Sequence, residues 1–265
     1  MIFEDNGIKV SDTSKYQVIM YDEKHNLLPP NKQKHIDYEK MKTYFSATIL
    51  KCGQWNYKDP AFYIGWRNAK AAGIPRSSYW FCDYRAKGKA QAQLYWSYIK
   101  NDIGEGFLAA DFEFGSWRDW KELYNFMEEL QQLSGLPNHK IVVYTGYYYF
   151  MEYYPKKASE QEWFAKYPLW IAAYTSGDPK YVKIPPLWKK AFLWQNGTPV
   201  IGYKTGVWSK EIDHNIVNGG QEEFEYFFNS GKPVVVTPTP DKIFRRMIVE
   251  RANGSKIVYT ENVRL

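Results

Sequence analysis

The stretch LAADFEFG, residues 108–115, places two acids inside an otherwise apolar run. If the run is a β-strand, alternate side chains face opposite sides, so Asp111 and Glu113 share a face with Ala109. A carboxyl group in apolar surroundings readily takes up a proton, and a second carboxylate nearby separates the two pKa values. The pattern therefore predicts an acid and a base side by side. For an isolated D-x-E, two structural hydrogen-bond acceptors at a strand end would be the better interpretation, so the surrounding sequence has to decide.

Short β-rich runs alternate with helical patterns along the chain, which favours a parallel sheet over a sandwich. The eight predicted strands are residues 7–12, 47–53, 77–84, 106–114, 140–146, 168–175, 191–196 and 211–217. The predicted helices are 36–45, 59–73, 89–101, 116–135 and a shorter one at 159–167, whereas 175–190 is predicted to be irregular loop. The clearest helix, 116–135, repeats apolar residues at helical spacing and ends at Gly135. These elements predict an α/β fold: an irregular (β/α) TIM-like barrel with eight strands, over residues 1–231.

Acidic and aromatic residues gather at the C-terminal ends of the predicted strands, where barrels of this kind have their active sites. They are Asp12, Asp83, Asp111, Glu113, Tyr144, Tyr174, Trp194 and Gln195. Strands commonly end where polarity returns, which explains Asp83. It explains less well a D-x-E with a further aspartate at another strand end. We therefore interpret these residues as a functional cluster.

The composition favours some classes of partner over others. The chain has 11 Trp, 23 Tyr and 15 Phe, more than a core of this size requires, and flat rings with polar groups suit stacking on sugars. The net charge is +6, but the basic residues are scattered, so nucleic acid is not an expected partner. No apolar run approaches the length of a membrane span, and no signal peptide is visible at the N-terminus. Cys52 and Cys82 are predicted to be free core thiols, and neither has the spacing of a metal ligand.

The composition changes abruptly near the C-terminus. Residues 232–241, KPVVVTPTPD, form a predicted proline-rich linker, and 242–265 read as two β-rich runs around Asn253-Gly254, a strong hairpin signal. A lone hairpin is marginal in water, so the tail is expected to dock on the barrel, form a homo-oligomer or bind a wall polymer. A frayed tail is the alternative interpretation.

A series of short motifs runs in order through residues 7–220. They are Asp12 with Ser14 and Gln17, Lys51 and Gly53, Asp59-Pro60, Gly73, Tyr79-Trp80-Phe81, Asp111-Phe112-Glu113, Tyr144-Thr145-Gly146, Leu169-Trp170-Ile171-Ala172, Tyr174, Trp194-Gln195 and Ile212-Asp213-His214-Asn215. With this ordered set the chain resembles the glycoside hydrolase family 25 lysozymes, the muramidases of phage endolysins and bacterial autolysins. Trp80 stands where the family usually has His, and Asn196 where Tyr usually follows Trp-Gln. Lys9 competes with Asp12 for the opening catalytic position, but the spacing to Ser14 and Gln17 favours Asp12.

The resemblance implies hydrolysis of the β-1,4 bond between N-acetylmuramic acid and N-acetylglucosamine in bacterial cell-wall peptidoglycan, without a metal or organic cofactor. It assigns Glu113 as the general acid and Asp111 as the group that orients the substrate's 2-acetamido group, which attacks in place of an enzyme nucleophile. Asp12 and Asp213 complete the catalytic residues. The implied substrate-binding residues are Tyr79, Tyr144, Trp170, Tyr174, Trp194 and Gln195.

The resemblance further implies a phage-encoded enzyme that acts at the bacterial cell wall, released by holin-type lysis or carried on the virion, without insertion into a membrane. Two alternatives stay open: a non-catalytic glycan-binding barrel and a structural component of a virion. A chitinase-like barrel would need aspartates at earlier positions of the fourth strand, and LAADFEF lacks them.

Overall fold

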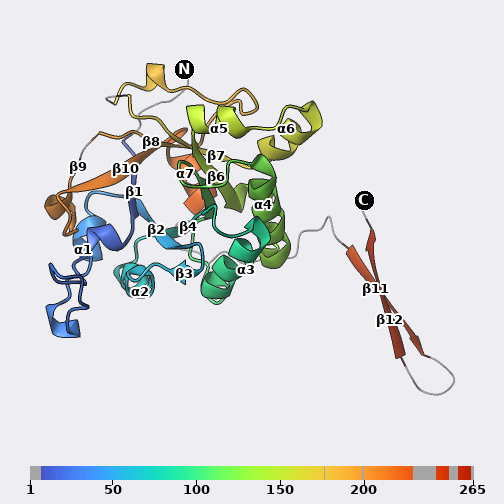
Figure 1. The fold of residues 1–265 in the computed structure, drawn as a ribbon, viewed down its shortest axis with the longest axis horizontal. Coiled ribbons are helices and arrows are strands. Elements are labelled where there is room, and N and C mark those ends of the chain that lie inside the picture. Colours follow the sequence, from blue (N-terminus) through green and yellow to red (C-terminus); the bar gives the residue numbers. More distant parts are fainter. Residues whose placement is uncertain (1–6, 176, 199, 229–242, 251–255, 264–265) are drawn as a thin grey trace.

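The computed structural model describes residues 7–175, 177–198, 200–228, 243–250 and 256–263 (Figure 1). Eight strands form the barrel: β1 Lys9–Thr13, β2 Ala47–Gln54, β4 Arg76–Phe81, β5 Leu108–Phe112, β6 Ile141–Gly146, β7 Leu169–Ala172, β8 Leu193–Gln195 and β10 Glu211–Val217. Each overlaps one of the predicted strands, although several are shorter than predicted. Two short strands, β3 Tyr57–Lys58 and β9 Val200–Ile201, pair with β2 and β10 at the edge of the barrel.

The sheet closes on itself, since the strand order runs β1-β10-β8-β7-β6-β5-β4-β2 and β2 pairs with β1 again. This confirms the predicted irregular α/β barrel. The expectation of a wholly parallel barrel was wrong, because β10 runs antiparallel to both β1 and β8. Apart from residue 199, which lies outside the described chain, residues 196–210 contain only β9 and the 3-10 helix η5, Gly202–Thr205. This segment has no full-length helix that would carry the chain back to the other end of the barrel. Strand β10 therefore begins at the same rim at which β8 ends, and it runs in the opposite direction.

Two apolar layers follow from the alternation of side chains along the strands. In β5, Ala109 faces the barrel interior with Val10, Ile49 and Val142. Ala110 and Phe112 face outward, into the layer beneath the helices. The sequence prediction that alternate residues of LAADFEF occupy opposite faces is thus confirmed. It places Asp111 on the interior side, two residues beyond Ala109.

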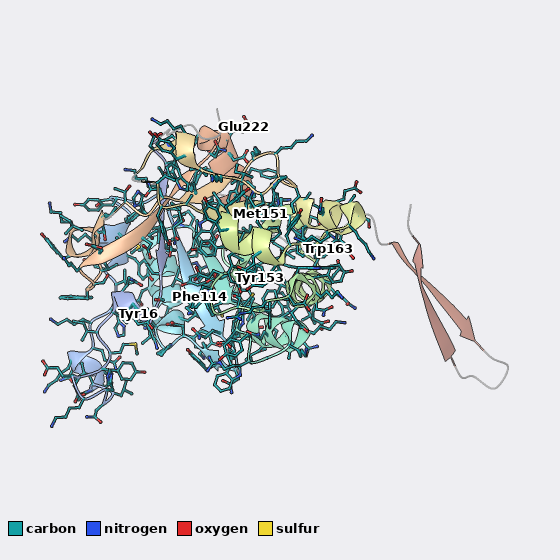
Figure 2. All side chains as sticks on the ribbon, turned by 45° about the horizontal axis from the view of Figure 1, so that its top comes forward. Tyr16, Phe114, Met151, Tyr153, Trp163 and Glu222 are labelled. Carbon is teal, nitrogen blue, oxygen red and sulfur yellow. The ribbon has the colours of Figure 1, made fainter. Side chains whose placement is uncertain are left out.

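Seven α-helices are described in the chain. They are α1 Tyr38–Met41, α2 Phe62–Ala72, α3 Gly88–Ile99, α4 Trp120–Ser134, α5 Tyr147–Tyr153, α6 Ala158–Ala165 and α7 Gly220–Phe228. In α4 the Asp119 carboxylate accepts the backbone N–H of Lys121, and the helix ends at Gly135, whose φ of 64° suits glycine. Trp163 of α6, labelled in Figure 2, donates to Glu128 of α4 at 2.8 Å.

Helix α7, which was not predicted, packs its phenylalanines into the bottom of the barrel. The rings of Phe227 and Phe192 stack with centroids 3.8 Å apart, and those of Phe228 and Phe107 meet edge to face at 5.3 Å. All four belong to the interior core. These rings close the bottom of the barrel, where the buried Lys140 also donates to the Phe227 carbonyl at 2.6 Å.

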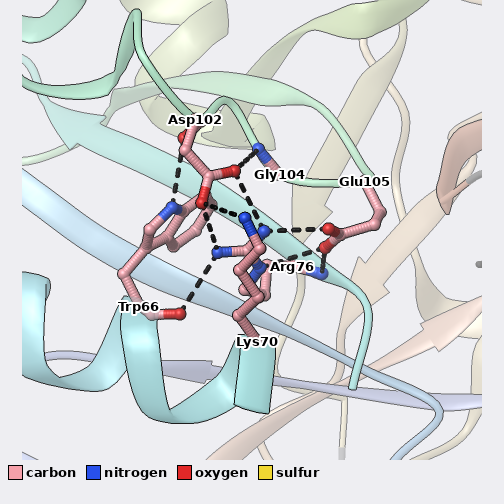
Figure 3. A network of polar contacts seen from close by, with 6 residues as sticks. All are labelled: Trp66, Lys70, Arg76, Asp102, Gly104 and Glu105. Carbon is pink, nitrogen blue, oxygen red and sulfur yellow. Dashed lines mark hydrogen bonds and ion pairs between the residues drawn. The ribbon is translucent and has the colours of Figure 1, made fainter. Parts of the chain in front are cut away.

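A buried arginine connects three elements near the same bottom end (Figure 3). Arg76, the first residue of β4, is fully buried. Its guanidinium donates to Asp102 at 3.0 and 3.1 Å and to Glu105 at 2.8 and 3.0 Å. It also lies 4.5 Å from the ring of Trp66 in α2, whose backbone carbonyl it contacts at 3.2 Å. Every ionic group of this cluster has a partner, as burial of a charge requires.

Further irregular elements connect these parts. They are the 3-10 helices η1 Lys15–Gln17, η2 Pro30–Lys32, η3 Asn138–Lys140 and η4 Pro179–Tyr181. Residues 175–190 contain no element except η4, as predicted, apart from residue 176, which lies outside the described chain. Cys52 and Cys82 are buried free thiols, also as predicted.

The described C-terminal residues form the predicted hairpin, with β11 Ile243–Glu250 antiparallel to β12 Lys256–Val263. Asn253-Gly254, the predicted turn, and the predicted linker 232–241 lie outside the described residues. Within the described chain, every helix is too short or too polar to span a bilayer.

Candidate active site

A cavity of about 150 Å³ opens at the rim where the parallel strands end. Nine residues line it: Asp12, Tyr79, Asp111, Glu113, Tyr144, Trp170, Tyr174, Gln195 and Asp213. Because β10 is antiparallel, Asp213 near its beginning reaches the same rim as Asp12 near the end of β1, and the two residues are register partners. The reversed strand therefore contributes its acid to the site instead of placing it at the bottom.

Asp12 is buried and held by two side-chain amides. Its Oδ2 accepts a hydrogen bond from Asn215 Nδ2 at 2.8 Å and one from Gln195 Nε2 at 3.1 Å. Burial and the nearby charge of Asp213 raise the pKa of Asp12 to about 7, although both amide bonds oppose this shift. Asp12 is thus fixed in position and able to exchange a proton near neutral pH.

Aromatic side chains support these amides from the side of β6 and β7. The hydroxyls of Tyr144 and Tyr174 both donate to Gln195 Oε1 at 2.8 Å, and Trp170 Nε1 donates to Asn215 Oδ1 at 2.6 Å. These bonds fix the amide orientations, so that each NH₂ group points at Asp12. The rings of Tyr144 and Trp170 pack edge to face with centroids 4.5 Å apart. The site therefore rests on a rigid aromatic wall.

Asp111, the last residue but one of β5, has a carboxyl oxygen without a partner in the described part of the chain. Oδ1 is buried, and no hydrogen bond reaches it from any residue the structure describes. Burial, followed by the charge of Glu113, raises the pKa of this carboxyl well above its usual range, while the Lys51 ammonium acts in the opposite direction. A buried acceptor without a donor is costly in a folded protein unless a ligand supplies the donor.

Glu113 lies in a tight turn directly after β5. Its backbone N–H donates to Ser116 Oγ at 3.1 Å, and the backbone N–H of Ser116 donates to the Glu113 carbonyl at 2.8 Å. The Ser116 hydroxyl in turn donates to the Asp111 carbonyl at 3.3 Å. Burial raises the pKa of the Glu113 carboxyl, Lys51 opposes the shift, and Asp213 adds to it. A fixed carboxyl with a raised pKa is suited to act as a general acid.

Lys51 places a positive charge among these acids. In β2, Ala47 and Ile49 face the barrel interior, so Lys51 continues the same face at the rim. Its Nζ donates to Gln54 Oε1 at 2.6 Å. Partial burial lowers the pKa of Lys51, against the opposing charges of Asp111 and Asp59. This cation reduces the repulsion between carboxylates that a common cavity would otherwise impose.

The structure brings together nine of the ten residues expected from the sequence. The exception is Trp194, which lies in the outer layer, 1% exposed, with Nε1 donating to the Ala173 carbonyl at 2.8 Å. Its neighbour Gln195 occupies the inward position, and in a strand two successive residues cannot both face inward. Asp83 pairs with Arg85 and does not line the cavity, as its structural interpretation predicted.

Three contributors were not among the expected site residues: Asn215, Lys51 and Ser116. The first two are motif positions of the resemblance, and β-alternation alone would have placed Lys51 on the inner face of β2. The role of Ser116 depends on a turn conformation that the sequence does not reveal.

The position of Asp12 supports a specific prediction about the first strand. We expect Asp12→Asn to lower hydrolytic activity severely, because the cavity loses a titrating acid, and Lys9→Ala to lower it only modestly. Lys9 opens β1 and pairs with Ile216, away from the rim. Initial rates on purified substrate, with melting temperatures as the folding control, measure both. A larger loss for Lys9→Ala would show that the catalytic position of β1 had been assigned to the wrong residue.

Comparison with known families gives a direct match. Residues 31–199 match the model of glycosyl hydrolases family 25. The chain belongs to glycosyl hydrolase family 25. The matched range contains Asp111 and Glu113, whereas Asp12 and Asp213 lie outside it. Their place in the site of this family 25 hydrolase therefore rests on the geometry of the cavity.

Solved structures share the fold of this family 25 hydrolase. A family 25 glycosyl hydrolase from Bacillus anthracis superposes with a TM-score of 0.64 at 20% identity, covering 85% of this chain and 94% of that one. A lysozyme from Streptomyces coelicolor gives 0.63 at 21% identity, with 86% and 100% covered. The catalytic domain of an endolysin from a Listeria monocytogenes bacteriophage gives 0.58 at 16% identity, with 82% and 95% covered. A search of curated protein sequences found no match.

Proposed function

We propose that this glycoside hydrolase is an N-acetylmuramidase, which cleaves the β-1,4 bond between N-acetylmuramic acid and N-acetylglucosamine in peptidoglycan. The observation that carries the proposal is the unpartnered Oδ1 of Asp111, buried beside Glu113 in a cavity with two further acids. An acceptor in this place fits the N–H of a 2-acetamido group, which both sugars of peptidoglycan carry. The aromatic wall of the cavity fits the apolar face of a sugar ring.

Glu113 acts as the general acid. It transfers its proton to the glycosidic oxygen as the bond to the anomeric carbon breaks. Asp111 accepts the acetamido N–H, and the acetamido carbonyl oxygen attacks the anomeric carbon, forming a cyclic oxazolinium ion. Glu113, now a carboxylate, then removes a proton from the water that opens this ring. The proton lost in the first step is recovered in the second.

The acetamido group resolves an electrostatic conflict at Asp111. In the unliganded site burial raises the pKa of this carboxyl, but the role assigned to it requires a carboxylate. An N–H donor hydrogen-bonds better to the charged form and therefore lowers the pKa. Binding of the correct sugar thus ionises Asp111, while Glu113 keeps the proton that it donates.

The other two acids hold the substrate and balance charge in this proposal. Asp12 is fixed by Gln195 and Asn215, and its pKa of about 7 lets it shed or gain a proton as the charge on Glu113 changes. Asp213 lies opposite it across the β1–β10 pair, where it can orient a sugar hydroxyl or water.

The raised pKa of Glu113 predicts a pH dependence. Because the protonated form is the reactive one, kcat falls as pH rises through the raised pKa of this carboxyl. On the acidic side kcat falls as Asp111, which is ionised in the substrate complex, takes up a proton. We expect a bell-shaped profile of kcat against pH, measured at saturating substrate where the melting temperature is constant. A rate that kept rising into alkaline solution would contradict the role of Glu113.

The likeness to phage endolysins supports a place of action. One structural neighbour is the catalytic domain of an endolysin. We infer that this chain also acts on the bacterial cell wall, as a phage-encoded lytic enzyme. Its C-terminal hairpin would then be a separate unit that contacts the wall or a second copy of the chain.

The bond assignment is tested on purified cell walls. We expect turbidity to fall as soluble muropeptides appear, and borohydride reduction followed by mass analysis to place the new reducing end on N-acetylmuramic acid. A reducing end on N-acetylglucosamine would overturn the bond assignment. Binding to walls without release of fragments would support the non-catalytic barrel instead.

A further inference from the structure

Exposed aromatic side chains follow three of the barrel strands at the rim that holds the cavity. Tyr16 after β1, Tyr84 after β4 and Phe114 after β5 are 71%, 67% and 84% exposed. Phe114 is labelled with Tyr16 in Figure 2. A phenylalanine side chain that is so exposed buries little apolar area and so contributes little to the stability of the fold. Exposed apolar groups that cluster beside a site indicate a binding surface.

The turn that fixes Glu113 also fixes Phe114. The Ser116 hydroxyl and backbone bond to residues 111 and 113, so residues 113–116 form one hydrogen-bonded unit. Gly115 has a φ of 96°, which favours glycine, and a Cβ there would contact the ring of Phe81 at 3.1 Å. The chain therefore turns sharply after Phe114. The ring of Phe114 therefore lies on the outside of this turn. The side chain of the preceding residue, Glu113, lines the cavity.

The loop that carries Tyr84 is equally well anchored. The buried side chain of Gln91 donates to the carbonyls of Asp83 at 2.6 Å and Ala86 at 2.9 Å, and it accepts the Asp83 N–H at 3.1 Å. Trp117 donates to the Ala86 carbonyl at 2.7 Å. Tyr84 itself donates its backbone N–H to the Gly115 carbonyl at 3.4 Å. The two loops are thus joined, and their exposed rings belong to one surface.

A third ring extends this surface over the turn between β2 and β3. Trp55 has a φ of 52°, a backbone conformation that is energetically costly for a residue with a large side chain. Residues in such conformations are concentrated at functional sites. The Arg85 guanidinium lies 4.1 Å from its ring while also bonding to Asp83. Trp55 is consequently held in place by a charged group that is itself fixed.

We propose that Phe114 and Tyr84, with Trp55 beside them, form a sugar-stacking platform that binds the glycan strand on the leaving-group side of the cut. This inference rests on the proposed muramidase function. Glu113 must face the leaving oxygen, and the platform begins at the next residue, so the strand passes from the cavity onto these rings. With the proposed bond, the first sugar on this side is N-acetylglucosamine. It carries no stem peptide, so its face is free to stack on a flat ring.

Binding and catalysis can be measured separately in the full chain. Phe114→Ala, Tyr84→Ala and the double variant are each made in the active chain and in the Glu113→Gln chain. Tyr44→Ala is the matched control, because Tyr44 is 50% exposed and precedes β2 at the opposite end of the barrel. Soluble glycan strands freed of stem peptides are the probe, titrated by calorimetry into the Glu113→Gln chains and hydrolysed by the active ones.

We expect each single variant to bind the strands up to about tenfold more weakly, with a larger loss in the double variant and no change for Tyr44→Ala. In active chains KM should rise by the same factor while kcat changes little, because stacking stabilises the bound substrate and the transition state equally. Melting temperatures should stay within a degree or two of the parent, since both rings are exposed.

Affinities equal to those of Tyr44→Ala in both loop variants would overturn the platform, whatever the enzyme cleaves. If the parent chain bound strands through these rings without hydrolysing them, the platform would stand and the muramidase function would fall. The calorimetric series therefore separates the two failures.

Discussion

Replacing Glu113 with glutamine is expected to lower peptidoglycan hydrolysis at least about 10²-fold, the usual loss when a general acid is removed. Glutamine keeps the shape of the side chain but cannot donate an acidic proton to the glycosidic oxygen. The turn that holds residue 113 uses only backbone atoms and Ser116, so it remains intact. Substrate binding should persist for the same reason.

Initial rates of muropeptide release measure this loss, and calorimetry with soluble glycan strands measures the retained affinity. Glu222→Gln is the matched control, because Glu222 is exposed on α7, away from the cavity, and is labelled in Figure 2. It should behave as the parent. If Glu113→Gln retained near-normal rates, another group would have to supply the proton, and the roles assigned to both acids of the D-x-E pair would have to be abandoned.

The strands and the acids on them could be predicted because period-two patterning is local. LAADFEF shows its two faces without any tertiary information. The direction of β10 could not be predicted in this way. It depends on the length and shape of residues 196–210, where short elements carry no periodicity. The parallel expectation failed at that strand alone.

Side-chain orientation near strand ends was the weaker part of the site prediction. Trp194 and Gln195 are adjacent, and an error of one residue exchanges inside for outside. The Trp194 side chain packs in the apolar layer beneath the helices, whereas the Gln195 side chain faces inward and donates to Asp12. The orphaned Oδ1 of Asp111 and the Gln195–Asp12–Asn215 chain exist only in three dimensions, since Asp12 lies 183 residues from Gln195 and 203 residues from Asn215 along the sequence.

Replacing Arg76 with methionine is expected to destabilise the barrel by about 3 kcal/mol, the lower end of the usual effect of breaking a buried ion pair, because the side chains of Asp102 and Glu105 are partly exposed. Methionine fills much of the space but leaves Asp102 and Glu105 without the guanidinium that bonds to both (Figure 3). The contact of the guanidinium with Trp66 and its carbonyl is lost as well. Chemical denaturation should show a lower midpoint with an unchanged slope.

Lys70→Met is the matched control for this change. Lys70 also pairs with Asp102, at 3.2 Å, but its side chain is 62% exposed, and exposed pairs contribute at most about 1 kcal/mol. The contrast between the two variants isolates the effect of burial. Equal losses would show that burial of the guanidinium contributes nothing beyond what an exposed cation beside Asp102 contributes.

The pH dependence of the Arg76 effect identifies its origin. Although partial burial raises the pKa of Asp102, the hydrogen bonds and charge of Arg76 outweigh this and hold it below its usual range. A carboxyl with a lowered folded pKa contributes stability above its unfolded pKa of about 4 and loses it as pH falls through the folded value. The difference between parent and Arg76→Met should therefore be largest near neutral pH and shrink below about pH 4. A difference independent of pH would mean that lost packing, and not the ion pairs, destabilises the variant.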